Sequence, residues 1–206
     1  FCDPNGKFPH NPEPLPDNLK ALSEKVVDEE ADFGIAVDPD VDRLALVCDD
    51  GSMFGEEYSL VTISDYVLSK TPGNTVSNLS STKALLDVTK KHNCKHYSSS
   101  VGEINVVEKM KQTNAIIGGE GNGGIIYPEL HYGRDALVGI ALFLTQLAER
   151  KISAKKLRES YTNYFISKNK IELNSKIDIE TIFSHLTNMY NENNINRIDG
   201  LKIDFK

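Results

Sequence analysis

The sequence predicts an α/β protein whose largest part is a three-layer α/β/α domain. Segments with helical and strand patterns alternate between residues 51 and 165. The strand candidates are short and apolar, and the helix candidates carry apolar residues three or four positions apart. Such alternation is typical of a sheet covered by helices on both faces. A length of 206 residues is enough for one or two domains of ordinary size.

The first 50 residues predict a loop, a helix and a strand pair. Residues 1–18 hold five of the eight prolines and therefore favour an extended ordered loop or a linker. Residues 18–30 place Leu19, Leu22 and Val26 on one helical face. Two apolar runs at 33–37 and 44–48 flank a polar loop, and the turn sequence at 49–51 follows them. We expect the two runs to pair as strands.

The next 115 residues predict the layered domain in detail. The expected helices are 56–69, 83–92, 103–112 and 135–149, and the expected strands are 75–79, 96–98 and 115–118. Ser80 or Ser81 is expected to cap the second of these helices, and residues 119–133 are expected to form a loop. Beyond residue 164 the composition shifts toward Asn and Ile. There we expect a helix at 177–191, a strand at 199–205 and a domain boundary at 165–175.

Composition narrows the class of protein. The formal net charge of -7 and the pI near 5.3 argue against a nucleic-acid surface, although a local basic pocket could still hold a small phosphorylated ligand. Cys2, Cys48 and Cys94 show no metal-ligand or disulfide spacing, which favours a reducing, cytoplasmic compartment. No apolar run is long enough to predict a membrane helix. The first residue is not Met, and we interpret the chain as the middle of a longer protein. The sequence does not determine an oligomeric state.

An aspartate-rich loop is the sharpest motif. Asp38, Asp40 and Asp42 alternate between the two apolar runs, and Arg43 follows them. Three carboxylates at alternate positions favour binding of a hard cation such as Mg²⁺. The arginine beside them favours binding of a phosphate group. Two alternatives remain open. One is an EF-hand, although its sixth position would need glycine and its flanks would be helices. The other is a solvated acidic turn.

A glycine-rich segment, GGEGNGG at 118–124, follows an apolar strand. Residues 119–124 fit the dinucleotide fingerprint GxGxxG, but the following Ile-Ile-Tyr-Pro argues against the helix that this fingerprint requires. A flexible hairpin with glycines at positive φ is a second alternative. The functional interpretation is a loop that closes on a polar ligand, with Glu120 and Asn122 as hydrogen-bonding groups.

Taken together, these motifs resemble the α-D-phosphohexomutase family. FGIAVDPDVDR is similar to the family's metal loop, DGDxDR, with Pro39 in place of its first glycine. The resemblance implies that Asp38, Asp40 and Asp42 bind Mg²⁺ and that Arg43 contacts the phosphosugar or the phosphoserine. The opening segment, FCDPNGKFPHNPEPLPDNL, also looks like the stretch upstream of that loop.

The glycine segment is similar to the family's sugar-binding loop, GExSGH, in which Glu grips sugar hydroxyls. By that resemblance the substrate-binding residues are Gly119, Glu120, Gly121, Asn122 and Gly123. Asn122 stands where the family has Ser, and Gly124 stands where it has His. Residues 99–103 resemble a short family loop that commonly carries Lys and His. HYGRD at 131–135 resembles the lead into a family helix, where Arg134 is a candidate phosphate contact and Asp135 a candidate cap.

The resemblance implies a Mg²⁺-dependent mutase that interconverts 6-phospho and 1-phospho sugars through a phosphoserine and a bisphosphorylated intermediate. Its partner would be a phosphorylated hexose or hexosamine (glucosamine, mannose or glucose), with no nucleic-acid or membrane partner. Residues 1–50 would end the family's second domain, 51–165 would form its third, and 166–206 would lead into its fourth. The family's serine segment is not among these residues, so we expect the chain alone to be inactive. The alternative is a non-catalytic module that binds a phosphosugar or a divalent cation.

Overall fold

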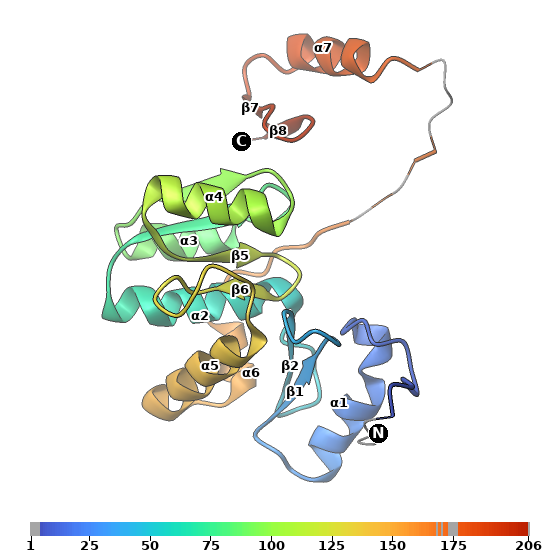
Figure 1. Cartoon of the computed structure of the whole chain (residues 1–206), viewed down its shortest axis with the longest axis vertical. Helices are drawn as coiled ribbons and strands as arrows, with labels where there is room; N and C mark the ends of the chain where they lie inside the picture. Colours follow the sequence, from blue (N-terminus) through green and yellow to red (C-terminus); the bar gives the residue numbers. More distant parts are fainter. Residues whose placement is uncertain (1–4, 168, 170, 173–176, 206) are drawn as a thin grey trace.

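The computed structural model describes residues 5–167, 169, 171–172 and 177–205. Figure 1 shows a lobe around β1 and β2, a larger layered domain, and a small C-terminal unit that contains α7. In chain order the elements are η1 (Pro16–Asn18), α1 (Lys20–Asp28), β1 (Phe33–Val37), β2 (Leu44–Cys48), α2 (Glu56–Lys70), β3 (Asn74–Asn78), α3 (Ala84–Lys91), β4 (His96–Ser99), α4 (Glu103–Thr113), β5 (Ala115–Glu120), β6 (Gly124–Ile126), α5 (Ala136–Arg150), α6 (Ala154–Glu159), α7 (Ile179–Met189), β7 (Asn194–Asn196) and β8 (Lys202–Asp204).

The first lobe confirms the predicted strand pair. β1 and β2 pair antiparallel, with Phe33 opposite Cys48 and Val37 opposite Leu44, and both have the predicted bounds. All five residues of β2 are buried, whereas β1 is buried only in part. This difference arises because β2 lies between β1 and the layered domain, where Leu44, Leu46 and Cys48 join the main core. β2 is therefore the strand that ties the first lobe to the rest.

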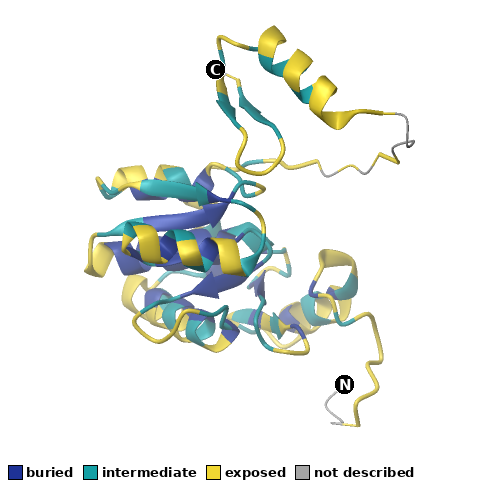
Figure 2. Ribbon diagram, turned by 45° about the horizontal axis from the view of Figure 1, so that its top comes forward, coloured by how far each residue is buried: buried dark blue, intermediate teal, exposed yellow. Residues whose placement is uncertain are grey.

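The layered domain confirms the predicted α/β/α architecture. Its sheet has the strand order β4-β3-β5-β6, in which β4, β3 and β5 run parallel and β6 runs antiparallel to β5. One small core joins the sheet to α4 through Val76, Val106, Met110, Ala115 and Ile126. The main core lies on the other face and includes Leu60, Ile63, Ile117, Ile125 and Phe143. Figure 2 shows the buried strands between the helices.

Two local expectations were wrong, and two short elements were missed. Residues 119–133 are not all loop, because β5 continues to Glu120 and β6 begins at Gly124, which makes a β-hairpin. Neither Ser80 nor Ser81 caps α3, whose N-cap is Lys83 without a side-chain hydrogen bond. Both serine hydroxyls instead donate to Asn78 Oδ1, at 3.3 and 2.8 Å. The short elements α6 and β7 were not predicted, since six and three residues carry too little periodicity.

The C-terminal unit contains the predicted helix and strand, as α7 and β8. It touches the layered domain where Val101 N–H donates to Asp199 Oδ2 at 2.8 Å and Ser100 Oγ donates to the Ile198 carbonyl at 3.2 Å. Within the predicted boundary at 165–175, residues 168, 170 and 173–175 lie outside the described residues. In the part of the chain that the structure describes, no helix combines the length and the apolar character needed to cross a bilayer.

A buried carboxylate holds the helices behind the sheet together. Asp65, on α2, is 1% exposed and accepts hydrogen bonds from His92 Nε2 at 2.7 Å, Arg150 at 2.7 Å and the Tyr161 hydroxyl at 3.0 Å. Burial by itself raises the pKa of Asp65, but the hydrogen bonds from His92 and Arg150 outweigh it and lower that pKa to about 2. The ionised carboxylate thus links α2 to the C-cap of α3, to α5 and to Tyr161, two residues after α6.

We expect Asp65 to make folding sensitive to acid. The pKa of about 2 for Asp65 in the folded chain lies below 3.8, the ordinary pKa of an aspartate. The stabilisation is therefore present above pH 4 and is lost as the pH falls from about 4 to 2, by roughly 2 kcal/mol in the free energy of unfolding. Urea unfolding of the chain and of Asp65→Asn between pH 2 and 7 checks this. The variant should be less stable at pH 7, and its stability should fall less steeply below pH 4. Parallel pH profiles would contradict the assignment.

Candidate functional site

The aspartate loop is folded around its first carboxylate. Asp38 follows β1 directly and is 3% exposed. Its Oδ1 accepts the backbone N–H groups of Asp42 and Arg43, each at 3.0 Å. Val41 adopts a left-handed conformation with φ of 59°, and its carbonyl accepts the Ala136 N–H at 3.0 Å. The turn therefore brings the later aspartates back over Asp38.

The three predicted metal ligands lie together. Asp38, Asp40 and Asp42 each offer a carboxylate oxygen, and these oxygens are within 4.8 Å of one another. Oxygens that bind one Mg²⁺ at about 2.1 Å lie no more than about 4.2 Å apart, so small side-chain rotations suffice. Asp40 is exposed, whereas Asp42 is half-buried. The donor set fits a hard divalent cation, and the flanking strands exclude an EF-hand.

Crowding of the carboxylates changes their acidity. Burial, together with the neighbouring Asp38, raises the pKa of Asp42, against the opposing charge of Arg134. Burial also acts to raise the pKa of Asp38, but hydrogen bonds from Arg43 and Asp42 outweigh it and lower that pKa to about 2. The two carboxylates titrate as a pair. Two acids this close together favour a cation between them.

Arg43 is held by two carboxylates. Its Nε donates to Asp38 Oδ2 at 2.6 Å, and its terminal nitrogens donate to Glu13 at 2.7 and 3.2 Å. The hydrogen bond with Glu13 is the main cause of the raised pKa of Arg43. The arginine thus orients Asp38 and fastens the proline-rich segment to the loop. Sequence reasoning missed Glu13, whose one signal is its place between Pro12 and Pro14.

The glycine segment forms the tip of the β5–β6 hairpin. Glu120, the last residue of β5, is 4% exposed. Its Oε1 accepts Asn78 Nδ2 at 2.8 Å and the Gly102 N–H at 3.1 Å, and its Oε2 accepts Arg134 at 3.0 Å. A carboxylate can accept about four hydrogen bonds, and these three donors occupy three of the four acceptor positions of Glu120. Asn122 Oδ1 accepts the Gly124 N–H at 3.2 Å and shapes the turn. A strand follows the glycines, which excludes the dinucleotide-binding geometry.

The two loops are in direct contact, although about 80 residues separate them in the sequence. Leu44 N–H donates to the Gly123 carbonyl at 3.0 Å, and Arg43 forms a β-bridge with Gly124. Gly123 has φ of 88°, and a Cβ there would lie 2.5 Å from the Leu44 carbonyl oxygen. Only glycine permits this approach. The contact makes one site of the two predicted motifs.

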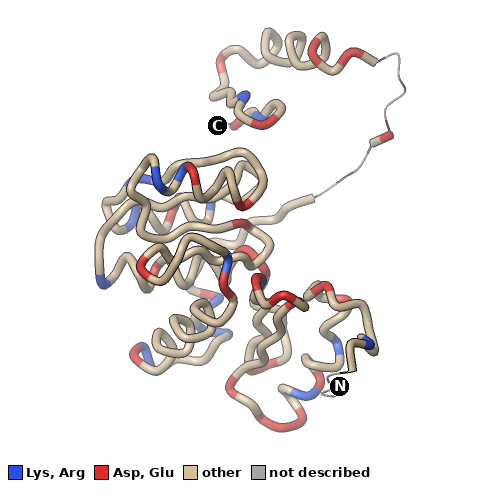
Figure 3. Tube along the Cα trace, viewed as in Figure 1, with Lys and Arg blue, Asp and Glu red and all other residues tan. Residues whose placement is uncertain are grey.

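Arg134 lies between the two loops. Its guanidinium contacts Asp42 and Glu120, and Nε lies 3.5 Å from Glu103 Oε2. Gly124 makes room for this side chain, since a Cβ there would lie 2.5 Å from Arg134 Cδ. Figure 3 shows acidic residues gathered where the first lobe meets the layered domain. Sequence reasoning placed Arg134 in the site but not Glu103, the first residue of α4.

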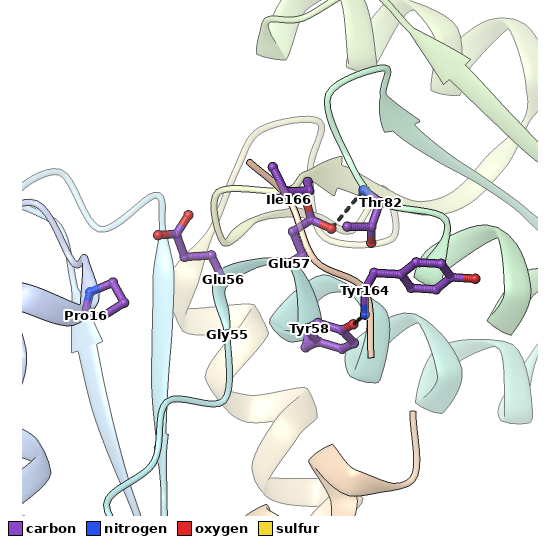
Figure 4. Close-up of a pocket in the computed structure, with 9 residues that line it drawn as sticks. Pro16, Gly55, Glu56, Glu57, Tyr58, Thr82, Tyr164 and Ile166 are labelled. Carbon is purple, nitrogen blue, oxygen red and sulfur yellow. Dashed lines mark hydrogen bonds between the residues drawn. The ribbon is translucent and has the colours of Figure 1, made fainter. Parts of the chain in front are cut away.

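A cavity of about 370 Å³ lies beside the tip of the hairpin. Its lining includes Gly121, Glu57 and Tyr58, and Figure 4 shows its walls. Glu57 accepts the Thr82 N–H at 2.8 Å. The Tyr58 hydroxyl donates to the Thr162 carbonyl and accepts the Tyr164 N–H, both at 2.8 Å. The cavity therefore has an acidic rim and a wall fixed by α2.

Comparison with known families gives two matches. Residues 55–164 match the phosphoglucomutase/phosphomannomutase α/β/α domain III, and residues 1–51 match domain II of the same family. The phosphoglucosamine/phosphogalactosamine mutase of Sulfurisphaera tokodaii is 30% identical over 93% of this chain and 43% of its own length. The phosphomannomutase/phosphoglucomutase of Pseudomonas putida is 31% identical over 100% of this chain and 46% of its own length. The chain thus spans less than half the length of these relatives.

Solved structures agree with these matches. A phosphoglucomutase/phosphomannomutase family protein from Burkholderia thailandensis superimposes with a TM-score of 0.79 at 25% identity, over 95% of this chain and 43% of the other. N-acetylphosphoglucosamine mutase from Aspergillus fumigatus, in complex with GlcNAc-6P and magnesium, shares the fold with a TM-score of 0.54 at 12% identity, over 82% and 44% of the two chains. With its aspartate loop and glycine hairpin joined as described, this chain belongs to the α-D-phosphohexomutase family.

Proposed function

We propose that this chain supplies the cation loop and the sugar loop of a phosphohexomutase that interconverts 6-phospho and 1-phospho hexoses or hexosamines. The proposal depends on one observation, which is that the two loops are in direct contact. Leu44 N–H donates to the Gly123 carbonyl, and Arg134 contacts both Asp42 and Glu120. Because the chain spans less than half of its relatives, the activity is that of the whole protein to which these residues contribute.

In this proposal Asp38, Asp40 and Asp42 hold Mg²⁺, which supplies positive charge to the phosphate that is transferred. Phosphoryl transfer depends mostly on positioning and on stabilising charge. The carboxylate spacing and the surplus of acidic groups support this role. Arg43 keeps Asp38 ionised and oriented, and Asp38 and Glu13 use three of its five N–H groups, which leaves two for a phosphate.

The sugar is bound by the hairpin, with Glu120 accepting from hydroxyls through its remaining acceptor position. Asn78 and Gly102 fix the orientation of this carboxylate. By the family resemblance Gly119, Gly121, Asn122 and Gly123 complete the sugar loop, and Gly121 lines the adjoining cavity of about 370 Å³. Arg134 supplies positive charge toward a phosphate.

Glucosamine and mannose phosphates are the preferred candidates for the substrate. The compartment proposed for the protein is the cytoplasm, because the free thiols of Cys48 and Cys94 fit a reducing environment.

A coupled mutase assay tests the proposal. The full-length protein that contains these residues is assayed with Mg²⁺, a hexose bisphosphate activator, and glucosamine 6-phosphate, mannose 1-phosphate or glucose 1-phosphate in turn. We expect turnover with one preferred sugar, and its loss when the cation is removed with a chelator. Cation binding by folded, phosphorylated protein without turnover on any sugar would instead favour the non-catalytic module. Turnover by the isolated 206-residue chain would contradict the expected dependence on further segments.

A further inference from the structure

One guanidinium contacts carboxylates from three separate parts of the fold. Arg134 pairs with Asp42 of the aspartate loop, with Glu120 at the end of β5 and with Glu103 at the start of α4. The side chains of Arg134, Asp42 and Glu120 are 20%, 16% and 6% exposed. Pairs shielded from water to this extent interact more strongly than pairs on an open surface. The contact therefore belongs to the interior of the site.

The backbone fixes where this side chain lies. Arg134 forms a β-bridge with Ile126, and its N–H donates to Glu103 Oε1 at 2.8 Å. The next residue, Asp135, donates its N–H to the Ile125 carbonyl at 2.8 Å. The stem lies over Gly124, which has no side chain to displace it. The location of the guanidinium is thus set by the hairpin itself.

Arg43, the other arginine of the site, has different main partners. It donates hydrogen bonds to Asp38 and Glu13. Its Nε also lies 3.6 Å from Asp42 Oδ1, whereas Arg134 contacts Oδ2 of the same carboxylate. Among the described residues, the cluster sets six carboxylates against these two guanidinium groups. They are Glu13, Asp38, Asp40, Asp42, Glu103 and Glu120. A divalent cation on the aspartates therefore competes with Arg134 for Asp42.

We propose that Arg134 is a positioning residue that couples the aspartate loop to the sugar loop. When a divalent cation takes Asp42, the guanidinium gives up that carboxylate and moves toward Glu103 and Glu120. Its Nε is buried and 3.5 Å from Glu103 Oε2, too far for a good hydrogen bond, so a small shift improves this contact. Cation binding thereby changes the charge that Glu120 presents to a sugar. The inference rests on the proposed function, because it takes the aspartates as the cation ligands.

A double-mutant cycle tests the coupling through Mg²⁺ affinity. Isothermal titration of Mg²⁺ is carried out on the whole chain, Arg134→Gln, Glu120→Gln and the double variant. Removal of Arg134 removes the competitor for Asp42, so we expect about tenfold tighter Mg²⁺ binding. With Arg134 present, Glu120→Gln lets the guanidinium hold Asp42 more firmly and weakens binding about fivefold. In the Arg134→Gln background the same change should alter affinity less than twofold.

Two further variants separate coupling from charge and from folding. Lys83→Gln removes a positive charge that pairs with Asp204, outside the cluster, and should change Mg²⁺ affinity less than twofold. Arg134→Lys keeps the charge but lacks the forked geometry, so Mg²⁺ affinity should stay near that of the unsubstituted chain while the effect of Glu120→Gln shrinks. Thermal melts by circular dichroism establish that each variant is folded.

The outcomes are distinct. A non-additive cycle with tighter binding by Arg134→Gln supports the coupling. Mg²⁺ binding with additive effects overturns the role of Arg134 and leaves the proposed function standing. Failure of the unsubstituted chain to bind Mg²⁺ overturns both.

Discussion

Replacing Asp40 by Asn is expected to weaken Mg²⁺ binding by at least about tenfold while leaving the fold unchanged. A carboxylate close to a divalent cation contributes several kcal/mol even in a polar surrounding, and about 1.4 kcal/mol already corresponds to tenfold. Asp40 is exposed, so an isosteric change there alters stability by less than about 0.5 kcal/mol. Isothermal titration with Mg²⁺ and a thermal melt measure the two quantities.

Asp17→Asn is the matched control. Asp17 is exposed, and its carboxylate pairs only at the surface with Lys20, at 3.3 Å. The control removes the same charge and should leave Mg²⁺ affinity nearly unchanged. Equal affinities for Asp40→Asn and Asp17→Asn would show that Asp40 is not a ligand. Asp38 is a poorer test position, because its buried carboxylate also closes the loop and pairs with Arg43.

Replacing Gly123 by Ala is expected to lower the free energy of unfolding by roughly 2–5 kcal/mol. An alanine at φ of 88° adopts a strained left-handed backbone, which costs about 1–2 kcal/mol. The added Cβ would also lie 2.5 Å from the Leu44 carbonyl oxygen, a backbone atom that cannot move aside alone. Overpacking of this kind costs about 1–3 kcal/mol more. Urea unfolding of the chain and of the variant measures the difference.

Gly55→Ala separates strain from the clash. Gly55 has φ of 96°, but its nearest neighbour would be Tyr58 Cδ2 at 3.2 Å, a contact that a displacement of a few tenths of an ångström relieves. This control should lose only the backbone part, about 1–2 kcal/mol. If both variants lose the same stability, the contact between the loops contributes nothing beyond the strain of a left-handed residue.

The regular elements were predictable because their signals are local. β1 and β2 are apolar runs bounded by turn residues, and both have the predicted bounds. Asp135 was foreseen near a helix start, and its Oδ1 accepts the Leu137 and Val138 N–H groups of α5 at 2.8 and 3.0 Å. β6 escaped prediction because three residues, one of them glycine, carry no periodicity. The division at residues 50 and 165 stays a prediction.

The site was predictable in its parts but not in its connections. The aspartates and the glycine segment each stand out by their composition, and the family resemblance assigns both motifs to one enzyme site. Two of the carboxylates that hold the arginines lie outside these motifs. Glu13 and Glu103 stand 30 and 31 residues from Arg43 and Arg134, so only the fold brings each pair together. Long-range ion pairs leave no periodic trace in a sequence.

The Tyr58 clamp beside the cavity has a consequence for amide exchange with solvent. Its hydroxyl holds the Thr162 carbonyl and the Tyr164 N–H, while the Arg158 guanidinium stacks 3.3 Å from the ring centroid. The chain is thus anchored to α2 up to Tyr164, whereas Phe165 is 89% exposed. The Tyr164 N–H should therefore be better protected from exchange than the N–H of Phe165. Tyr58 thereby sets a sharp difference in exchange between two consecutive backbone amides, which can be read residue by residue.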